Sequence, residues 1–161
     1  MRVGFGYDIH QFRDGASGPL RLGGVDIPNA PQLKGHSDGD PLIHAVIDAL
    51  LGAAGEGDIG KHFPPGEAAT AGIDSRVLLE RVSALLLSRR IDIVNVDATI
   101  IAEYPPLSDH FLAMRETIAN ALGMDDDRVN VKATTNEGLG VIGSGQAIAA
   151  MAVALIEEHV R

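Results

Sequence analysis

The chain has 161 residues, 45% of them hydrophobic and 22% charged, which is enough for one globular domain with a buried core. Its formal net charge of −9 disfavours nucleic-acid binding, which needs basic patches, and implies that an anionic substrate would bind through metal cations. The sequence contains no cysteine, which excludes disulfides and thiolate metal sites, and no apolar run near the roughly 18 residues of a membrane span.

The first predicted element is a strand over residues 3–10. Its side chains alternate between two faces, so Asp8 and His10 point to the same side. No signal or transit segment precedes this strand, and we therefore expect a cytoplasmic protein. After a turn at residues 13–18, the alternating residues 20–27 predict a hairpin-like strand that ends at Pro28.

The densest group of polar residues and glycines lies in residues 35–60. Asp40 and the proline after it predict the start of a helix over residues 42–51. His44 and Asp48 are the only polar residues of that helix, and their spacing of four places them on one face. Beyond the helix, glycines surround Asp58 and predict either a loop that approaches a ligand closely or a plain terminating turn.

A metal site is one interpretation of three of these residues. Asp8 and His10 on a strand, with His44 on a helix, form a set of nitrogen and oxygen ligands that suits zinc. Three protein ligands leave a fourth position open, as in catalytic zinc sites. The alternative is an ordinary core histidine, with Asp48 solvated on the helix surface. If the site exists, Asp48 either orients the His44 ligand or contacts the substrate.

The remaining elements complete the prediction of the fold. They are a loop over residues 62–72, a helix capped by Asp74 and Ser75 that extends to about residue 90, a strand over 91–102, a helix over 108–122 capped by Ser108 and ended by Gly123, a strand over 129–135, and an apolar helix over about 146–160. We expect one domain over residues 1–161, an α/β (α+β) two-layer sandwich in which helices pack on one face of a small mixed sheet.

Five segments together carry a family pattern: residues 6–10, 35–40, 44–60, 95–102 and 130–140. Over essentially its full length the chain resembles the 2-C-methyl-D-erythritol 2,4-cyclodiphosphate synthases, phosphorus–oxygen lyases of the non-mevalonate isoprenoid pathway. The resemblance implies a homotrimer with active sites at the subunit interfaces. It also implies a metal-assisted intramolecular phosphoryl transfer on 4-diphosphocytidyl-2-C-methyl-D-erythritol 2-phosphate. The 2-phosphate would attack the β-phosphorus, release CMP and close the 2,4-cyclodiphosphate.

The resemblance also implies individual residue roles. Zinc would be held by Asp8, His10 and His44, and magnesium or manganese by Glu137. The catalytic residues would be His36, Thr135 and Glu137. The substrate-binding residues would be Asp8, His10, His36, Ser37, Asp40, Asp48, Asp58, Ile59, Gly60, Ala102, Thr134, Thr135, Asn136 and Glu137.

Three loops depart from the family pattern. Residues 63–67 lack the usual first carboxylate of that loop, and residues 102–107 lack the basic residue usual in the cytosine-binding loop. Residues 143–147 lack the usual arginine and glutamate, with Ser144 at the arginine position. In several family members that arginine anchors an isoprenoid diphosphate in a cavity on the trimer axis. We therefore expect this chain to bind isoprenoid diphosphates weakly.

Two other functions are considered. A zinc phosphohydrolase would need a general base beside the metal, for which only Asp48 or Asp58 is available. A trimeric binding protein with a degenerate site would fit the altered loops, although the presence of Thr134, Thr135 and Glu137 weighs against it. Incubation with the cytidine diphosphate substrate distinguishes the three functions by the product formed.

Overall fold

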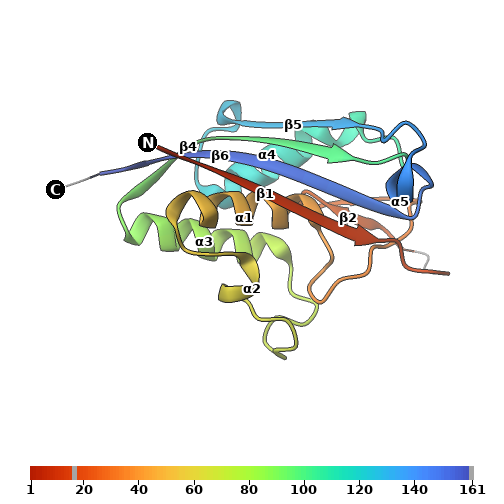
Figure 1. Cartoon of the computed structure of the whole chain (residues 1–161), viewed down its shortest axis with the longest axis horizontal. Helices are drawn as coiled ribbons and strands as arrows, with labels where there is room; N and C mark the ends of the chain where they lie inside the picture. Colours follow the sequence, from red (N-terminus) through yellow and green to blue (C-terminus); the bar gives the residue numbers. More distant parts are fainter. Residues whose placement is uncertain (16–17, 160–161) are drawn as a thin grey trace.

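The computed structural model describes residues 1–15 and 18–159 and contains a four-stranded mixed sheet (Figure 1). Its strands lie in the order β1 (Arg2–Gln11), β6 (Ala147–Glu158), β4 (Ile91–Ile101) and β5 (Val129–Thr134). β6 pairs antiparallel with β1 and with β4, whereas β4 and β5 are parallel. β1 is therefore an edge strand. Its side chains alternate between a more buried face and an exposed face.

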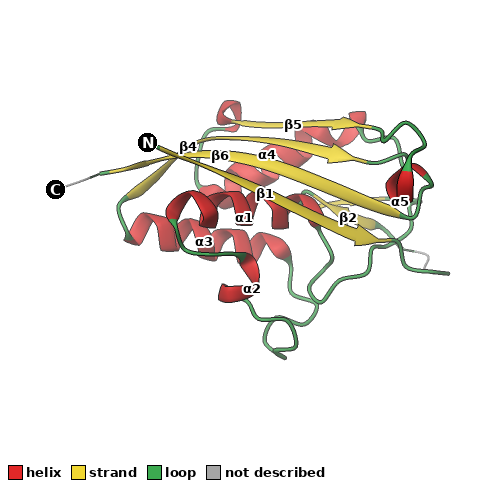
Figure 2. Ribbon diagram, viewed as in Figure 1, coloured by secondary structure: helices red, strands yellow, loops and turns green. Residues whose placement is uncertain are grey.

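Helices cover one face of this sheet (Figure 2). The long ones are α1 (Pro41–Ala54), α3 (Ser75–Ser88) and α4 (Phe111–Leu122), and the expected two-layer sandwich is confirmed. The shorter elements are the hairpin β2 (Leu20–Leu22) and β3 (Val25–Ile27), the helices α2 (Ile59–His62) and α5 (Gly140–Gly143), and the 3-10 turns η1 (Ser108–His110) and η2 (Asp126–Arg128). Among the described residues, no helix is long and apolar enough to span a membrane.

The helix ends follow the predicted capping residues with two exceptions. Ser75, predicted as a cap together with Asp74, is the first residue of α3, and its hydroxyl donates to the Asp38 carboxylate. Asp40 caps α1, Asp74 caps α3, and Gly123 ends α4 in the left-handed conformation at φ 69°. The prediction that Ser108 caps a helix is wrong. Ser108 is the first residue of η1, and its hydroxyl donates to the Asp109 carboxylate at 3.4 Å instead of to a free backbone N–H.

The predicted helix over about residues 146–160 is also wrong, because residues 147–158 form β6. Residue 160 lies outside the described part of the chain. Along β6, buried Ala150, Ala152 and Ala154 alternate with exposed Met151 and Val153. Alanine favours helices in isolation, but here the backbone groups of β6 pair on both sides, with β1 and β4.

Two glycines of β1 allow α1 to pack closely on this strand. Gly4 and Gly6 lie on the β1 face that meets α1, on the same side as Asp8. A Cβ on Gly6 would lie 1.9 Å from the Ala45 carbonyl oxygen, and one on Gly4 would lie 2.0 Å from the Ala49 oxygen. The helix therefore packs directly on the strand backbone, which brings its side chains to those of Asp8 and His10.

Candidate active site

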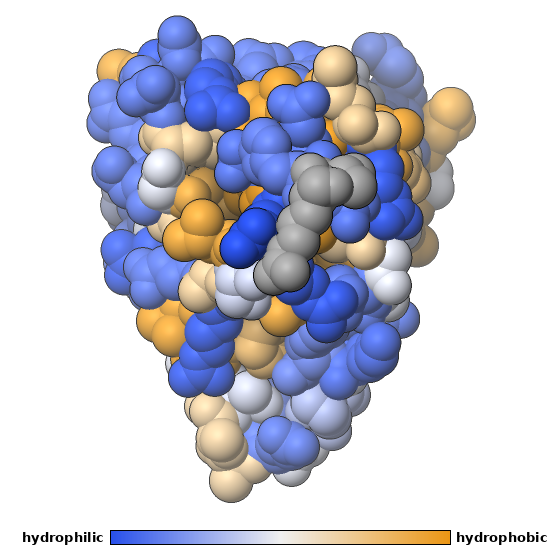
Figure 3. Space-filling view, turned by 90° about the vertical axis from the view of Figure 1, so that its left-hand side faces the viewer, coloured by the Kyte–Doolittle hydropathy of each residue, from blue (hydrophilic) through white to orange (hydrophobic). Residues whose placement is uncertain are grey.

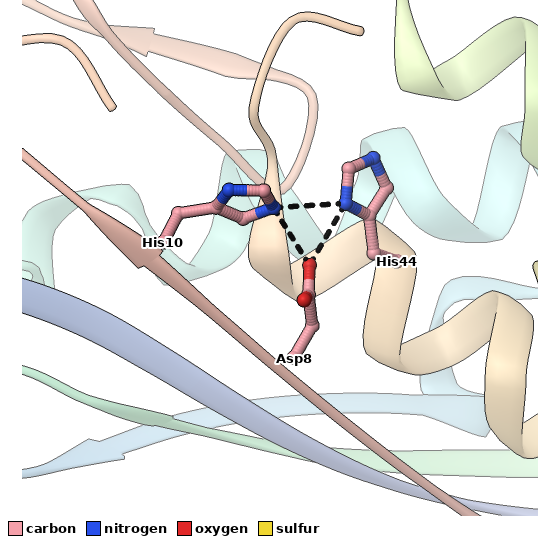
Figure 4. Close-up of side chains that lie close together, drawn as sticks. All are labelled: Asp8, His10 and His44. Carbon is pink, nitrogen blue, oxygen red and sulfur yellow. Dashed lines mark hydrogen bonds and ion pairs between the residues drawn. The ribbon is translucent and has the colours of Figure 1, made fainter. Parts of the chain in front are cut away.

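Three side chains from β1 and α1 converge in one cluster, shown in Figure 4. Asp8 and His10 come from β1, and His44 comes from the first half of α1. The Asp8 Oδ2 atom lies 2.8 Å from His44 Nδ1 and 2.9 Å from His10 Nε2. The two ring nitrogens are 3.3 Å apart. The structure thus brings together the three residues for which a zinc site is predicted.

The outward-facing atoms of the cluster have partners of their own. His10 Nδ1 contacts the Lys34 carbonyl oxygen and so acts as a donor, which leaves a lone pair on Nε2. The other Asp8 oxygen, Oδ1, accepts from the Ile9 N–H at 2.9 Å. His10 Nε2, His44 Nδ1 and Asp8 Oδ2 therefore face one common point. Tetrahedral zinc with bonds of about 2.0 Å separates its ligand atoms by about 3.3 Å, so the donor set fits this metal.

The charges in the cluster favour an ionised carboxylate. Burial raises the pKa of Asp8, but hydrogen bonds and charge interactions with His10 and His44 outweigh burial and hold the pKa below its ordinary value. Burial lowers the pKa of His10, yet the hydrogen bond and charge of Asp8 raise it overall. Metal ligands bind in their deprotonated forms, and the Asp8 carboxylate is in that form at neutral pH.

A cavity of about 210 Å³ lies beside the cluster. Of the predicted substrate-binding residues, Asp8, His10, His36, Ser37, Ile59 and Gly60 line it, and the metal-site residue His44 lines it too. The His36 Nε2 atom lies 3.2 Å from the Thr70 hydroxyl and 3.2 Å from the Glu67 carbonyl oxygen. The contact with Glu67 ties His36 to the loop over residues 63–67 that departs from the family pattern.

Three predicted carboxylates do not line this cavity. Asp40 is fully buried and accepts from four backbone N–H groups, those of Gly23, Gly24, Leu42 and Ile43. Its predicted contact with substrate is therefore wrong, because the carboxylate is enclosed and joins the β2–β3 turn to the start of α1. Asp48 accepts from the Ile59 N–H at 2.8 Å, and Asp58 caps α2 through the Lys61 N–H at 2.9 Å.

A second group of predicted residues lies at the ends of β4 and β5, outside the cavity of the metal cluster. Thr134, Thr135 and Glu137 are exposed, and the Thr135 hydroxyl donates to the Glu137 carboxylate at 3.2 Å. Glu137 has a φ of 51°, in the left-handed region. Ala102 is buried, and its N–H donates to the Thr134 carbonyl at 3.0 Å, which joins the two strand ends.

Sequence reasoning missed three residues that organise these groups. Glu103 Oε1 accepts from the N–H groups of Asn136 and Gly138, at 2.8 and 3.2 Å, and so holds the loop that carries Glu137. Asp38 and Ser75 lie behind the His44 ring. A glutamate after a strand, an aspartate in a loop and a serine at a helix start are all common, so the sequence alone gives no signal for these roles.

The profile of the YgbB family matches residues 1–157. A protein of Thiobacillus denitrificans is 56% identical over 98% of this chain and 97% of its own length, and one of Geotalea uraniireducens is 54% identical over 98% and 99%. Both are named 2-C-methyl-D-erythritol 2,4-cyclodiphosphate synthase.

Solved structures show the same similarity. The Plasmodium falciparum IspF complex with CDP has a TM-score of 0.85 and 36% identity, covering 99% of this chain and 97% of that one. The bifunctional IspDF of Campylobacter jejuni has a TM-score of 0.92 and 39% identity; the match covers 98% of this chain but only 42% of that protein. The chain therefore belongs to the YgbB family, together with the 2-C-methyl-D-erythritol 2,4-cyclodiphosphate synthases.

Proposed function

We propose that this protein converts 4-diphosphocytidyl-2-C-methyl-D-erythritol 2-phosphate into 2-C-methyl-D-erythritol 2,4-cyclodiphosphate and CMP, as a lyase of isoprenoid biosynthesis. The observation that carries the proposal is the cluster of Asp8, His10 and His44 beside a cavity, in a chain that matches synthases over nearly their full length. A cytoplasmic location is part of the proposal, and the absence of cysteine agrees with it.

Asp8, His10 and His44 would hold zinc. When bound, zinc supplies positive charge to a phosphoryl group of the substrate. The reaction places few other demands on the protein, because the attacking 2-phosphate is already anionic and needs no activating base. The work of the side chains is to align two phosphate groups and to offset their repulsion. His36 and Ser37 line the same cavity and would bind the methylerythritol phosphate end.

Thr134, Thr135, Asn136 and Glu137 would bind the diphosphate, and Glu137 would hold magnesium or manganese. Exposed hydroxyls and an exposed carboxylate at the ends of parallel strands support this role. Glu103 holds this loop in place, since its carboxylate accepts hydrogen bonds from the two backbone N–H groups on either side of Glu137. The cytidine end would bind beside Ala102, in the loop that lacks the family's basic residue.

A homotrimer with shared sites would join the two groups of residues. The cavity of about 210 Å³ is smaller than the roughly 300 Å³ at which ligand pockets begin, and Thr134 to Glu137 are absent from its lining. The sheet face opposite the helices exposes apolar side chains of β1 and β6, including Phe5, Tyr7, Met151 and Val153. By contrast, the end of the molecule where β1 begins and β6 ends shows mostly hydrophilic side chains with scattered apolar ones (Figure 3). Burying the apolar face against further copies would be favourable.

The alternatives have less support. A phosphohydrolase would need a free carboxylate beside the metal, and Asp48 and Asp58 each accept a backbone hydrogen bond at a helix start. Incubation of the purified protein with the cytidine diphosphate substrate, zinc and magnesium is the direct test. Cyclic product with CMP supports the proposal, whereas simple hydrolysis or no reaction contradicts it.

The metal site has a test of its own. Replacing His44 with alanine removes one of three ligands, and the purified variant should retain little zinc per chain. Metal analysis of the variant and the wild type decides the matter. An undiminished zinc content in the variant would place the metal elsewhere.

A further inference from the structure

A line of hydrogen bonds leaves the metal cluster on the far side of the His44 ring. His44 Nδ1 faces Asp8, and the opposite ring nitrogen, Nε2, lies 2.9 Å from the Ser75 hydroxyl oxygen. The Ser75 hydroxyl in turn lies 2.5 Å from Asp38 Oδ1, and the Ser75 N–H donates to Asp38 Oδ2 at 2.9 Å. Ser75 is fully buried, so water does not compete for these bonds.

The chemistry of the groups fixes the direction of each bond. A histidine that offers the Nδ1 lone pair to a metal carries its proton on Nε2, so Nε2 donates to the Ser75 oxygen. The Ser75 hydroxyl then has its own proton to donate, and the Asp38 carboxylate can only accept. The Arg21 Nε atom lies 3.6 Å from Asp38 Oδ2 and forms an ion pair with it. The order from metal to arginine is therefore His44, Ser75, Asp38 and Arg21.

A second hydroxyl competes for the same ring nitrogen. The Ser37 oxygen lies 3.0 Å from His44 Nε2. Ser37 is half-buried and lines the cavity, where groups of a substrate would reach it. Ser75 is enclosed, and two bonds to Asp38 hold it in place, so it is the better preorganised acceptor. This arrangement leaves the Ser37 hydroxyl available to the cavity.

We infer that Ser75 and Asp38 are positioning residues for the metal ligand His44. The inference deepens the proposed function and rests on its metal site. The two residues hold the His44 ring at the angle at which Nδ1 meets Asp8 and His10, and they fix the tautomer that binds a metal. Loss of such an outer partner weakens metal binding by about 10- to 100-fold in other proteins.

The test is the zinc dissociation constant of purified, metal-stripped protein, measured by competition with a chromophoric chelator. Ser75→Ala keeps the N–H that donates to Asp38 and removes only the hydroxyl, and we expect its zinc affinity to fall by about 10- to 100-fold. Ser75→Thr restores a hydroxyl and should recover most of the affinity. Ser83→Ala is the matched control, because Ser83 lies on the same helix and donates to the Leu122 carbonyl at 3.0 Å, away from the cluster. It should bind zinc like the wild type.

Cobalt substitution gives a readout that a general loss of stability would not change. The visible absorption of bound cobalt reports ligand geometry, and we expect Ser75→Ala to shift it while Ser83→Ala does not. If Ser75→Ala fails to fold, Asp38→Asn tests the same inference, and its zinc affinity should also fall.

Wild-type zinc affinity and an unchanged cobalt spectrum in Ser75→Ala, or in Asp38→Asn where the first variant does not fold, would overturn the inference while leaving the metal site intact. A larger affinity loss in Ser37→Ala than in Ser75→Ala would overturn it as well. A wild-type protein that binds no divalent metal would overturn both the proposed metal site and this inference.

Discussion

Replacing Gly6 with alanine tests whether the close packing of α1 on β1 builds the metal cluster. The added Cβ would lie 1.9 Å from the Ala45 carbonyl oxygen and 2.8 Å from the Ala49 N. Both are backbone atoms, so no side chain can rotate away. The helix must move by about 1.1 Å merely to restore a separation of 3.0 Å, the shortest that real Cβ contacts show. His44 lies on this helix, one residue before Ala45.

That movement has two measurable effects. Overpacking a core costs about 1–3 kcal/mol, and a clash with rigid backbone should reach the upper end, about 3 kcal/mol. For a chain of this size the loss corresponds to a fall in Tm of about 6–12 °C. Metal–ligand distances tolerate shifts of only about 0.2 Å, so zinc affinity should fall by more than tenfold. Thermal unfolding by circular dichroism and zinc competition measure the two effects separately.

Gly52→Ala is the matched control. Gly52 lies near the end of the same helix, is exposed, and a Cβ there would meet nothing nearer than the Phe5 carbonyl oxygen at 4.0 Å. The substitution should raise stability, since alanine favours helix over glycine by about 1 kcal/mol. If the same Gly→Ala change lowers the Tm at position 6 and raises it at position 52, the contact between α1 and β1 is the cause of the loss. A Gly6→Ala protein with wild-type Tm and zinc affinity would refute the reasoning.

The remaining predictions concern charge. Glu137→Gln keeps the shape of the side chain but removes the proposed second-cation ligand, so turnover should fall by about a hundredfold with zinc content unchanged; near-normal turnover at saturating magnesium would contradict this role. The pKa of Asp8 lies below its unfolded value, so its contribution to the stability of metal-free protein is present above about pH 4 and is lost as pH falls toward the folded pKa. Acid unfolding of Asp8→Asn should show a weaker pH dependence. Geranyl diphosphate should bind with a dissociation constant of about 1 mM by calorimetry, because Ser144 brings no charge and its hydroxyl donates to the Val141 carbonyl at 3.1 Å; micromolar binding would contradict this.

The sequence predicts β1 well because the two faces of the strand have different neighbours. Gly4, Gly6, Asp8 and His10 face α1, whereas the residues between them are exposed and mostly apolar. β6 carries apolar side chains on both faces, with alanines toward the helices, so its alternation in polarity is weak. Alanine is the strongest helix former, and the two strands that pair with β6, β1 and β4, are both distant from it in the sequence.

The convergence of Asp8, His10 and His44 could be predicted because their residue types are restricted and their local spacing is regular. Asp38 and Ser75 could not, because the bonds between them join residues 37 positions apart and depend on how the loop before α1 meets the start of α3. At Asp40 the residue pattern correctly predicted the cap of α1, whereas the family resemblance implied a substrate contact. The carboxylate is instead enclosed by the β2–β3 turn.

The three polar residues at the start of α1 and within it each contact a different neighbouring segment. Asp40, His44 and Asp48 are spaced four apart and lie along one side of the helix. Asp40 accepts from the β2–β3 turn, His44 contacts Asp8 on β1, and Asp48 accepts from the N–H of Ile59 at the start of α2. Each turn of the helix thus fixes a different segment around the cavity. A shift of α1 along its axis would break all three contacts together, so the metal cluster and the cavity wall formed by Ile59 and Gly60 depend on the same placement of the helix.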